Sequence, residues 1–204
     1  MSDSESAAPL GWPSGRFRCI VADPPWEYPA GWPMGSAKGQ AAKRAATTGQ
    51  TFDRARKTPL PYPAMTVQEI AALPVAGCAA DGCHLYLWTT NKYLEPAFGI
   101  VRAWGFEYST LLAWCKTPMG QGPGGTFASN MEFVLFARRG VLRATGKQTT
   151  RWWNWKRMGK AHSRKPEAFQ DMVESVSPGP YLELFARRAR PGWTVWGNEV
   201  EAND

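Results

Sequence analysis

The amino-acid sequence predicts an α/β fold in which helices cover both faces of a mostly parallel sheet. Short apolar runs alternate along the chain with amphipathic segments of about a dozen residues, an order typical of strand-helix-strand units. The run "CIVA" at 19–22 is apolar at every position, as expected of a parallel strand buried on both faces. Polar motifs follow two such runs directly, and ligands of these folds bind at the carboxyl ends of the strands.

The apolar runs give the expected strands, which span 16–22, 84–90, 108–116, 131–139, 181–186 and 193–197. Helices are expected at 66–73, 92–105 and 165–176. The first opens with a capping box from Thr66 to Glu69, in which each end satisfies the other's backbone donor. The second stops at Gly105, and the third has Pro166 at its first helical position.

Length and composition favour one domain over residues 1–204. The chain has 204 residues, of which 44% are hydrophobic and 20% charged, enough for one sizeable core. We expect residues 1–15 to be flexible. No apolar run reaches bilayer-spanning length, and the N-terminus lacks the basic and apolar regions of a signal peptide, so we expect a cytoplasmic protein with no membrane contact. The four cysteines fit neither a redox pair nor a zinc site, which predicts reduced, mostly buried thiols and no metal.

The net charge of +7 conceals a strong segregation of charge. Residues 30–62 and 138–165 together hold 16 of the 24 Lys and Arg residues and one of the 17 acids, a net of 16 − 1 = +15. The rest of the chain therefore carries 8 − 16 = −8. Two basic loops on an acidic scaffold indicate a polyanionic substrate, with nucleic acid first among them. The alternative is that these are solvated loops whose charge is fortuitous.

The stretch "VADPPWEYPAG" carries the clearest chemical signal in the chain. Asp23 ends a buried strand, and Pro24 and Pro25 form a stiff arm because proline fixes its own φ and restricts the residue before it. The Asp23 carboxylate and the Pro24 carbonyl are then two adjacent acceptors, and Pro25 has no N–H to compete for them. Trp26 adds a flat face on which a planar ring could stack. Together these residues predict a pocket for an aromatic amine; the alternative is a rigid turn with a buried tryptophan.

These residues resemble the MT-A70 family of S-adenosylmethionine-dependent adenine-N6 methyltransferases. An Asp-Pro-Pro-Trp motif after an apolar strand is the family's signature, and it falls here on Asp23 to Trp26. Further blocks at 85–117, 129–140, 162–174 and 181–199 are similar to the family in the same order. The resemblance implies a Rossmann-like methyltransferase sheet with this motif near the N-terminus and the cofactor blocks near the C-terminus. It also implies a bacterial or phage protein, because long N-terminal extensions are missing.

The resemblance implies roles for individual residues. Asp23, Pro24, Pro25 and Trp26 fall on the catalytic motif. The cofactor contacts, for S-adenosylmethionine, fall on Asp23, Lys165, Arg187, Asn198 and Glu199. Glu132 falls on the glutamate that opens the middle strand beside the substrate pocket. With the aromatic and basic residues around these blocks, the candidate substrate contacts are Tyr28, Lys116, Glu132, Arg151, Trp152, Trp153 and Lys156.

The substrate is expected to be nucleic acid, with DNA favoured over RNA. An adenine amino group is paired inside a duplex, so the base must be flipped out or already single stranded. The stretch "RWWNWKR" at 151–157 mixes stacking and cationic side chains as nucleic-acid surfaces do, although it could equally be the edge of the core. Two alternatives stay open: an inactive nucleic-acid-binding paralogue and a cytosine-N4 methyltransferase. A homodimer is a further alternative, since the eukaryotic relatives work as heterodimers.

Overall fold

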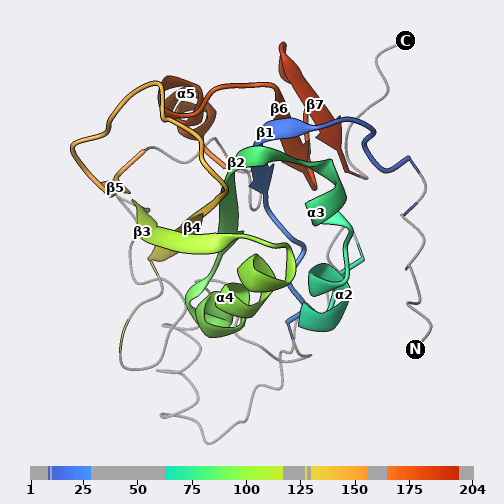
Figure 1. Ribbon diagram of the computed structural model, residues 1–204. Helices are drawn as coiled ribbons and strands as arrows, with labels where there is room; N and C mark the ends of the chain where they lie inside the picture. The colour runs from blue at the N-terminus through green and yellow to red at the C-terminus, as the bar shows by residue number, and fades with distance from the viewer. Residues whose placement is uncertain are drawn as a thin grey trace, which may run out of the picture.

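The computed structural model describes residue 9 and residues 11–28, 63–116, 127, 130–155 and 165–197. These residues form a seven-stranded sheet in the order β5-β3-β4-β2-β1-β6-β7 (Figure 1). The strands are β1 (Phe17–Ala22), β2 (Ala79–Thr89), β3 (Glu107–Cys115), β4 (Met131–Arg139), β5 (Trp152–Trp153), β6 (Tyr181–Leu184) and β7 (Trp193–Trp196). All six expected strands are therefore present, with ends shifted by a few residues.

The sheet is mixed but largely parallel, as the sequence predicts. Strand β1 pairs in parallel with β2 and β6, β6 with β7, and β3 with β5. Only β4, among the described strands, runs against its neighbours β2 and β3. The carboxyl ends of β1, β2 and β6 consequently meet at one edge of the sheet, and β4 begins at that edge.

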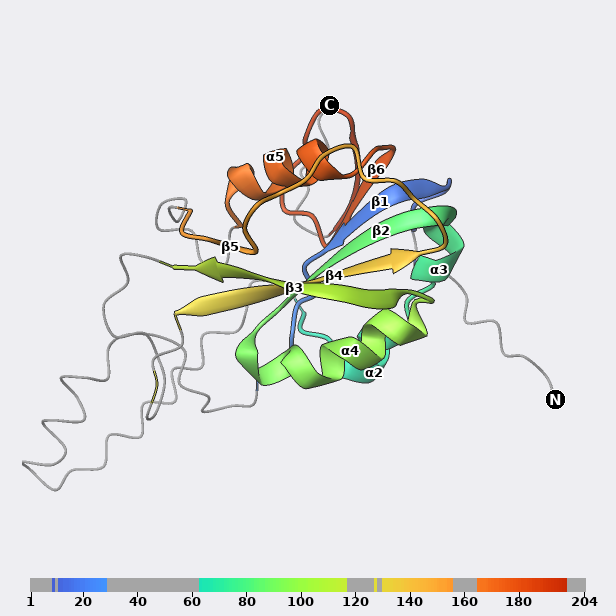
Figure 2. The same ribbon diagram turned by 60° about the vertical axis from the view of Figure 1, so that its left-hand side comes forward.

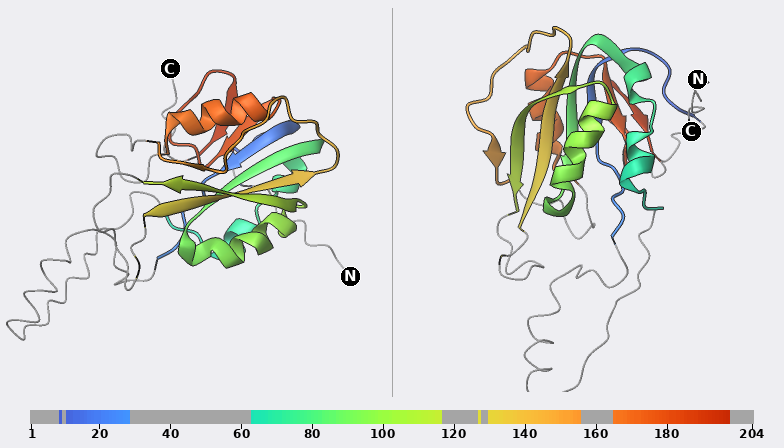
Figure 3. Two further views of the ribbon diagram at one scale, coloured as in Figure 1. Left: turned by 90° about the vertical axis from the view of Figure 1, so that its left-hand side faces the viewer. Right: turned by 60° about the horizontal axis from the view of Figure 1, so that its bottom comes forward.

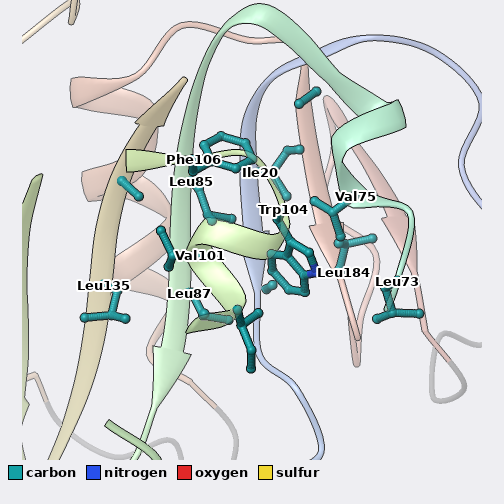
Figure 4. Close-up of a cluster of buried hydrophobic side chains, with 14 of the residues drawn as sticks. Ile20, Leu73, Val75, Leu85, Leu87, Val101, Trp104, Phe106, Leu135 and Leu184 are labelled. Atoms are coloured by element: carbon teal, nitrogen blue, oxygen red, sulfur yellow. The ribbon is translucent and has the colours of Figure 1, made fainter. Parts of the chain in front are cut away.

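Helices cover both faces of the sheet, which confirms that prediction. Figure 2 shows α2 (Val67–Ala71) and α4 (Leu94–Ala103) on one side and α5 (Glu167–Val176) on the other. The short helix α3 (Val75–Cys78) leads into β2, and a 3-10 turn at Asn91–Tyr93 precedes α4. On the α4 side, Leu85, Leu87 and Trp104 belong to a buried apolar cluster, shown in Figure 4.

The helix ends follow the predicted signals. Thr66 caps α2, and its hydroxyl and the Glu69 carboxylate satisfy each other's backbone N–H. Helix α4 ends at Gly105, whose φ of +77° is left-handed, and the N–H of Phe106 reaches back to the carbonyl of Val101. Pro166 lies one position earlier than predicted, as the N-cap of α5 rather than its first helical residue.

Three features of the secondary structure were not expected. Helix α3, the early start of β2 at Ala79 and the two-residue strand β5 all lie where the apolar pattern is weak or short. A distant segment passes close to the start of β2. A Cβ on Gly82 would lie 2.6 Å from the Val141 carbonyl oxygen. The chain after β4 thus passes so close to Gly82 that a larger residue would collide, a tertiary contact that local propensity does not reveal.

Trp12 packs against the edge of the sheet. Its indole N–H donates to the Cys78 thiol at 2.9 Å, and its ring meets Trp196 edge-on. The flexibility of residues 1–15 stays a prediction. Cys19, Cys78 and Cys83 are buried and Cys115 partly so, all as free thiols, as predicted. None of the described helices is long and apolar enough to cross a bilayer.

The second basic loop is divided between the two ends of the sheet, while residues 30–62 lie outside the described residues. Arg138 and Arg139 close β4, opposite His84 and Cys83, at the end away from Asp23. Arg139 is bound there to the carbonyl of Ala76. The following segment then runs past the end of α5, where the Thr145 N–H donates to Val176, and continues to β5 (Figure 3). Only its later part approaches the carboxyl edge.

Candidate active site

A pocket opens at the carboxyl edge where β1, β2 and β6 meet the start of α5. Its volume is about 460 Å³, which includes space continuous with the solvent. Its lining comes from those elements and from the loop after β6, and comprises Val21, Asp23, Trp88, Lys165, Pro166, Phe169, Gln170, Glu183, Phe185, Arg187 and Arg188. The structure thus brings together Asp23, Lys165 and Arg187, three predicted cofactor residues that are far apart in the sequence.

A chain of alternating charges runs beside this pocket. The Lys165 ammonium lies 2.7 Å from Asp23 Oδ2 and 3.3 Å from Glu132 Oε2. Glu132 also forms an ion pair with Lys116 through its other oxygen. All four side chains are less than one-fifth exposed. Aromatic faces support the cations, because Lys165 lies 5.1 Å from the centre of the Trp88 ring.

These pairings keep the buried groups ionised. Burial alone would lower the pKa of Lys165, but the Asp23 and Glu132 carboxylates outweigh it and raise that pKa above its ordinary value. Burial would likewise raise the pKa of Glu132, but Lys165 and then Lys116 lower it. Two carboxylates can therefore stand close together in this site because one ammonium lies between them.

The Asp-Pro-Pro-Trp arm follows β1 and turns at Pro25. The Pro25 carbonyl accepts the Met65 N–H at 2.8 Å, and Trp26 forms an isolated parallel bridge with Met65. Pro25 supplies no competing donor, but the Trp26 N–H donates to the Pro24 carbonyl at 2.9 Å. One lone pair of that carbonyl is therefore already used by the Trp26 N–H, a donor that the prediction, which concerned Pro25, did not include.

Trp26 belongs to the buried core and is not among the residues that line the pocket. Its side chain is 5% exposed and stacks on Tyr93, with ring centres 4.8 Å apart and planes 16° from parallel. Tyr28 lies beside them, bonded to the Thr90 hydroxyl at 2.9 Å, and burial raises the pKa of its phenol. The Lys92 ammonium lies over the rings of Tyr28 and Tyr93. Tyr93 already covers one face of the Trp26 ring.

The tryptophan-rich stretch divides between core and surface. Trp153 and Trp155 stack with centres 4.8 Å apart and pack against the core under α5, as the core-edge interpretation expects. Trp152 is 60% exposed, and Arg151 beside it is exposed and bonds Thr110. Glu132 and Lys116 lie at the pocket edge of the sheet, whereas Lys156, Asn198 and Glu199 lie outside the described residues.

Three pocket residues were missed as functional candidates. Glu183 lies in the middle of an apolar strand, and a lone acid in such a run indicates a functional site. Gln170 donates to Glu183 at 2.5 Å and accepts from Arg188. Neither Gln170 nor Arg188 could be selected from the sequence, because a polar residue on an amphipathic helix or in a loop is usually exposed.

The pocket suits a ligand that carries both signs of charge and a planar apolar group. Asp23 and Glu183 offer carboxyl groups, Lys165 and Arg187 offer cations, and Val21, Phe169 and Phe185 offer apolar surface. S-adenosylmethionine has an ammonium group, a sulfonium centre, a carboxylate and an adenine ring, so this donor set fits it. The fold and site define a class of α/β protein that binds such a ligand at the carboxyl edge of its sheet.

Comparison with known proteins identifies the family. The MT-A70 family model matches residues 49–199. The chain is 31% identical over 197 residues to the type II methyltransferase M.MunI of a Mycoplasma species, covering 94% of this chain and 81% of that protein. The chain belongs to the MT-A70 family and is an adenine-N6 methyltransferase of that family. Enzymes of this family use S-adenosylmethionine.

Eukaryotic relatives are more distant and longer. The chain is 29% identical to the N6-methyladenosine RNA methyltransferase MTA1 of Cryphonectria parasitica, covering 90% of this chain and 52% of that protein. It is 24% identical to the human N(6)-adenosine-methyltransferase catalytic subunit METTL3, covering 92% of this chain and 29% of that protein. The chain thus spans about half or less of these two proteins.

Proposed function

We propose that this chain methylates the N6 amino group of adenine in DNA, and that the Asp23 carboxylate accepts a hydrogen bond from that amino group. The observation that carries the proposal is the position of Asp23, fixed between a rigid proline arm and the Lys165 ammonium at the edge of the pocket. When bound, S-adenosylmethionine supplies the methyl group. The chain's own residues have to place and polarise the nitrogen that accepts it.

Asp23 is suited to orient an aromatic amine. Its Oδ2 is taken by Lys165, and we assign Oδ1 to one N–H of the adenine amino group. The remaining lone pair of the Pro24 carbonyl takes the second N–H. Two acceptors on one side favour a pyramidal nitrogen, whose lone pair then points away from them. Positioning of this kind can supply a large part of the acceleration, since no strong base is needed before the methyl group arrives.

Lys165 and Glu132 are assigned to fix the orientation of Asp23, because the Lys165 ammonium binds both carboxylates. Lys165 has two acids within 3.3 Å, so its ammonium cannot rotate freely away from Asp23. The same ammonium is the group we assign to the cofactor's carboxylate, together with Arg187 for its ribose. Asn198 and Glu199 remain proposed adenine and ribose contacts on the strength of the family motif.

DNA is the preferred substrate for two reasons. The term "type II methyltransferase", which names the Mycoplasma relative, denotes a class that modifies DNA, and the chain covers 81% of that protein. The exposed Trp152 and Arg151 also lie at the sheet edge beside β3, where they suit a displaced base and its phosphate. The fungal relative is named an RNA methyltransferase, so RNA is the alternative to test.

The decisive experiment supplies purified protein with methyl-labelled S-adenosylmethionine and three substrates of one sequence: single-stranded DNA, duplex DNA and RNA. Digestion to nucleosides then locates the label. We expect N6-methyldeoxyadenosine, with more label on single-stranded than on fully paired DNA because no base pair has to open. Oligonucleotides with every adenine replaced serve as the matched control.

Each result has a clear meaning. Label in RNA alone would mean that the substrate is RNA and not DNA. Label in cytosine would mean that the target base is cytosine. An absence of labelled adenine in all three substrates would refute the proposed function. Calorimetry with unlabelled cofactor then identifies an inactive paralogue, which would bind nucleic acid without binding S-adenosylmethionine.

A further inference from the structure

Glu183 is an acid in an otherwise apolar strand whose side chain opens into the pocket. Its neighbours Leu182 and Leu184 are fully buried on the opposite face of β6. In the sheet it lies between Val21 of β1 and Val195 of β7. Asp23 follows Val21 by two residues and therefore points to the same face, so both carboxyl groups line one pocket.

Glu183 is held by a neutral donor that is itself fixed in orientation. The Gln170 side-chain nitrogen donates to Glu183 Oε2 at 2.5 Å, while the Gln170 oxygen accepts from Arg188. Because Arg188 can only donate, it requires Gln170 to present its N–H groups to Glu183. Arg188 is in turn paired with Glu167 in the first turn of α5.

No cation is paired with Glu183 among the described residues, unlike Asp23 and Glu132. Lys165 is already within ion-pair distance of those two acids. Burial raises the pKa of Glu183 to about 7, the Gln170 bond opposes this, and the Asp23 charge adds to it. Arg188 and Arg190 lower it only partly. Near neutral pH, Glu183 therefore exchanges between its protonated and ionised forms.

We propose that Glu183 binds the ammonium group of the cofactor's amino-acid part and releases its own proton to solvent when it does so. This inference rests on the proposed function. An ammonium group has three N–H donors and needs an anion that no other cation already neutralises. In the step, the carboxyl O–H bond breaks, the proton passes to the buffer, and an N–H donor of the ammonium takes its place at the oxygen.

The inference makes cofactor binding dependent on pH. Below pH 7 Glu183 is increasingly protonated, so binding must first remove a proton and becomes weaker. The charged groups facing Glu183 are Asp23 from β1, Lys165 before α5, and Arg187, Arg188 and Arg190 after β6, while β7 presents Val195.

The test is calorimetry of S-adenosylmethionine at pH 7 in two buffers with different ionisation enthalpies, which counts the protons released on binding. We expect the wild type to release measurably more protons than E183Q, and E183Q to bind about ten-fold or more weakly. E95Q is the matched control, since Glu95 is an exposed acid on α4 that does not line the pocket. It should match the wild type.

A second ligand and a second variant keep the test decisive. 5′-Methylthioadenosine lacks the amino-acid part, and it should bind without releasing this proton. Q170L keeps the acid but removes its donor, so the pKa of Glu183 should rise and more proton be released at pH 7. Equal proton release from wild type and E183Q, or release with methylthioadenosine, would overturn the inference alone. A wild type that binds no S-adenosylmethionine would overturn the proposed function itself.

Discussion

The two ends of helix α5 cover two buried polar groups of very different character. At its start, Lys165 joins Asp23 and Glu132 in a set of charged side chains that borders the pocket. At its end, Ser177 bonds both His84 and Tyr86 at 2.8 Å, and all three are almost completely buried. One end holds charge at an opening, and the other holds neutral groups in a closed core.

The difference separates a functional from a structural use of burial. Burying any polar group costs free energy unless it is bonded, and burying a charge costs more. At the closed end the chain uses hydroxyl and imidazole groups that need no charge, and burial lowers the pKa of His84. At the open end it keeps charged groups, to which the proposed function assigns roles. The polar residues of the sheet are therefore informative mainly where they approach the carboxyl edge.

The largest effect is expected from Asp23→Asn at the open end. The amide keeps the shape of the side chain but loses the negative charge that accepts the hydrogen bond from the adenine amino group. The methylation rate should therefore fall by at least about 100-fold. Cofactor affinity should fall much less. Rates and cofactor binding are measured on the same preparations, with the exposed Asp81→Asn as control. A variant that loses binding and rate equally would show that Asp23 serves the cofactor alone.

Lys165→Met should have the next largest effect, on stability as well as rate. It leaves Asp23 and Glu132 as two close acids with no ammonium between them. Breaking a buried pair in this way costs roughly 3 kcal/mol of unfolding free energy. Lys116→Met is the matched control, because Glu132 then keeps Lys165. Equal losses in urea unfolding of the two variants would argue against a central role for Lys165.

The sequence predicts the strands and the position of Asp23 because both depend on local patterns. Apolar runs set the strands, and the Asp-Pro-Pro-Trp motif marks a strand end. The sequence does not predict the partner of each charge: Lys165 lies 142 residues from Asp23, and only the sheet order brings them together. The antiparallel β4 and the Gly82 contact with Val141 are likewise consequences of tertiary packing.

Ser177→Ala tests the closed end and should affect stability only. His84 and Tyr86 lose a shared hydroxyl partner in a region without water access, which costs about 1–3 kcal/mol. Because this network lies at the far end of α5, the methylation rate well below the unfolding temperature should stay within about two-fold of the wild type. Thermal unfolding and rates measured together check this. A large loss of rate in a folded protein would mean that the two ends are coupled.

The smallest effect is the pH dependence of stability, because the two ends act in opposite directions. The pKa of His84 lies below 6.5, so its contribution is present above that pH and is lost as the pH falls. The pKa of Glu183 rises from 4.5 to about 7, so its contribution is present at low pH and is lost as the pH rises through 7. Each slope is at most about 1.4 kcal/mol per pH unit, and between pH 5 and 6.5 they partly cancel.

Single variants should separate these two slopes. In His84→Asn, acidification from pH 7 to 5 should stabilise the protein, because only the Glu183 contribution remains. In Glu183→Gln the same acidification should destabilise it, because only the His84 contribution remains. Urea unfolding at several pH values measures both, with the wild type between them. If both variants changed the dependence of the unfolding free energy on pH in the same direction, Glu183 and His84 would not act in opposite directions, and the contrast between the two ends of α5 would be wrong.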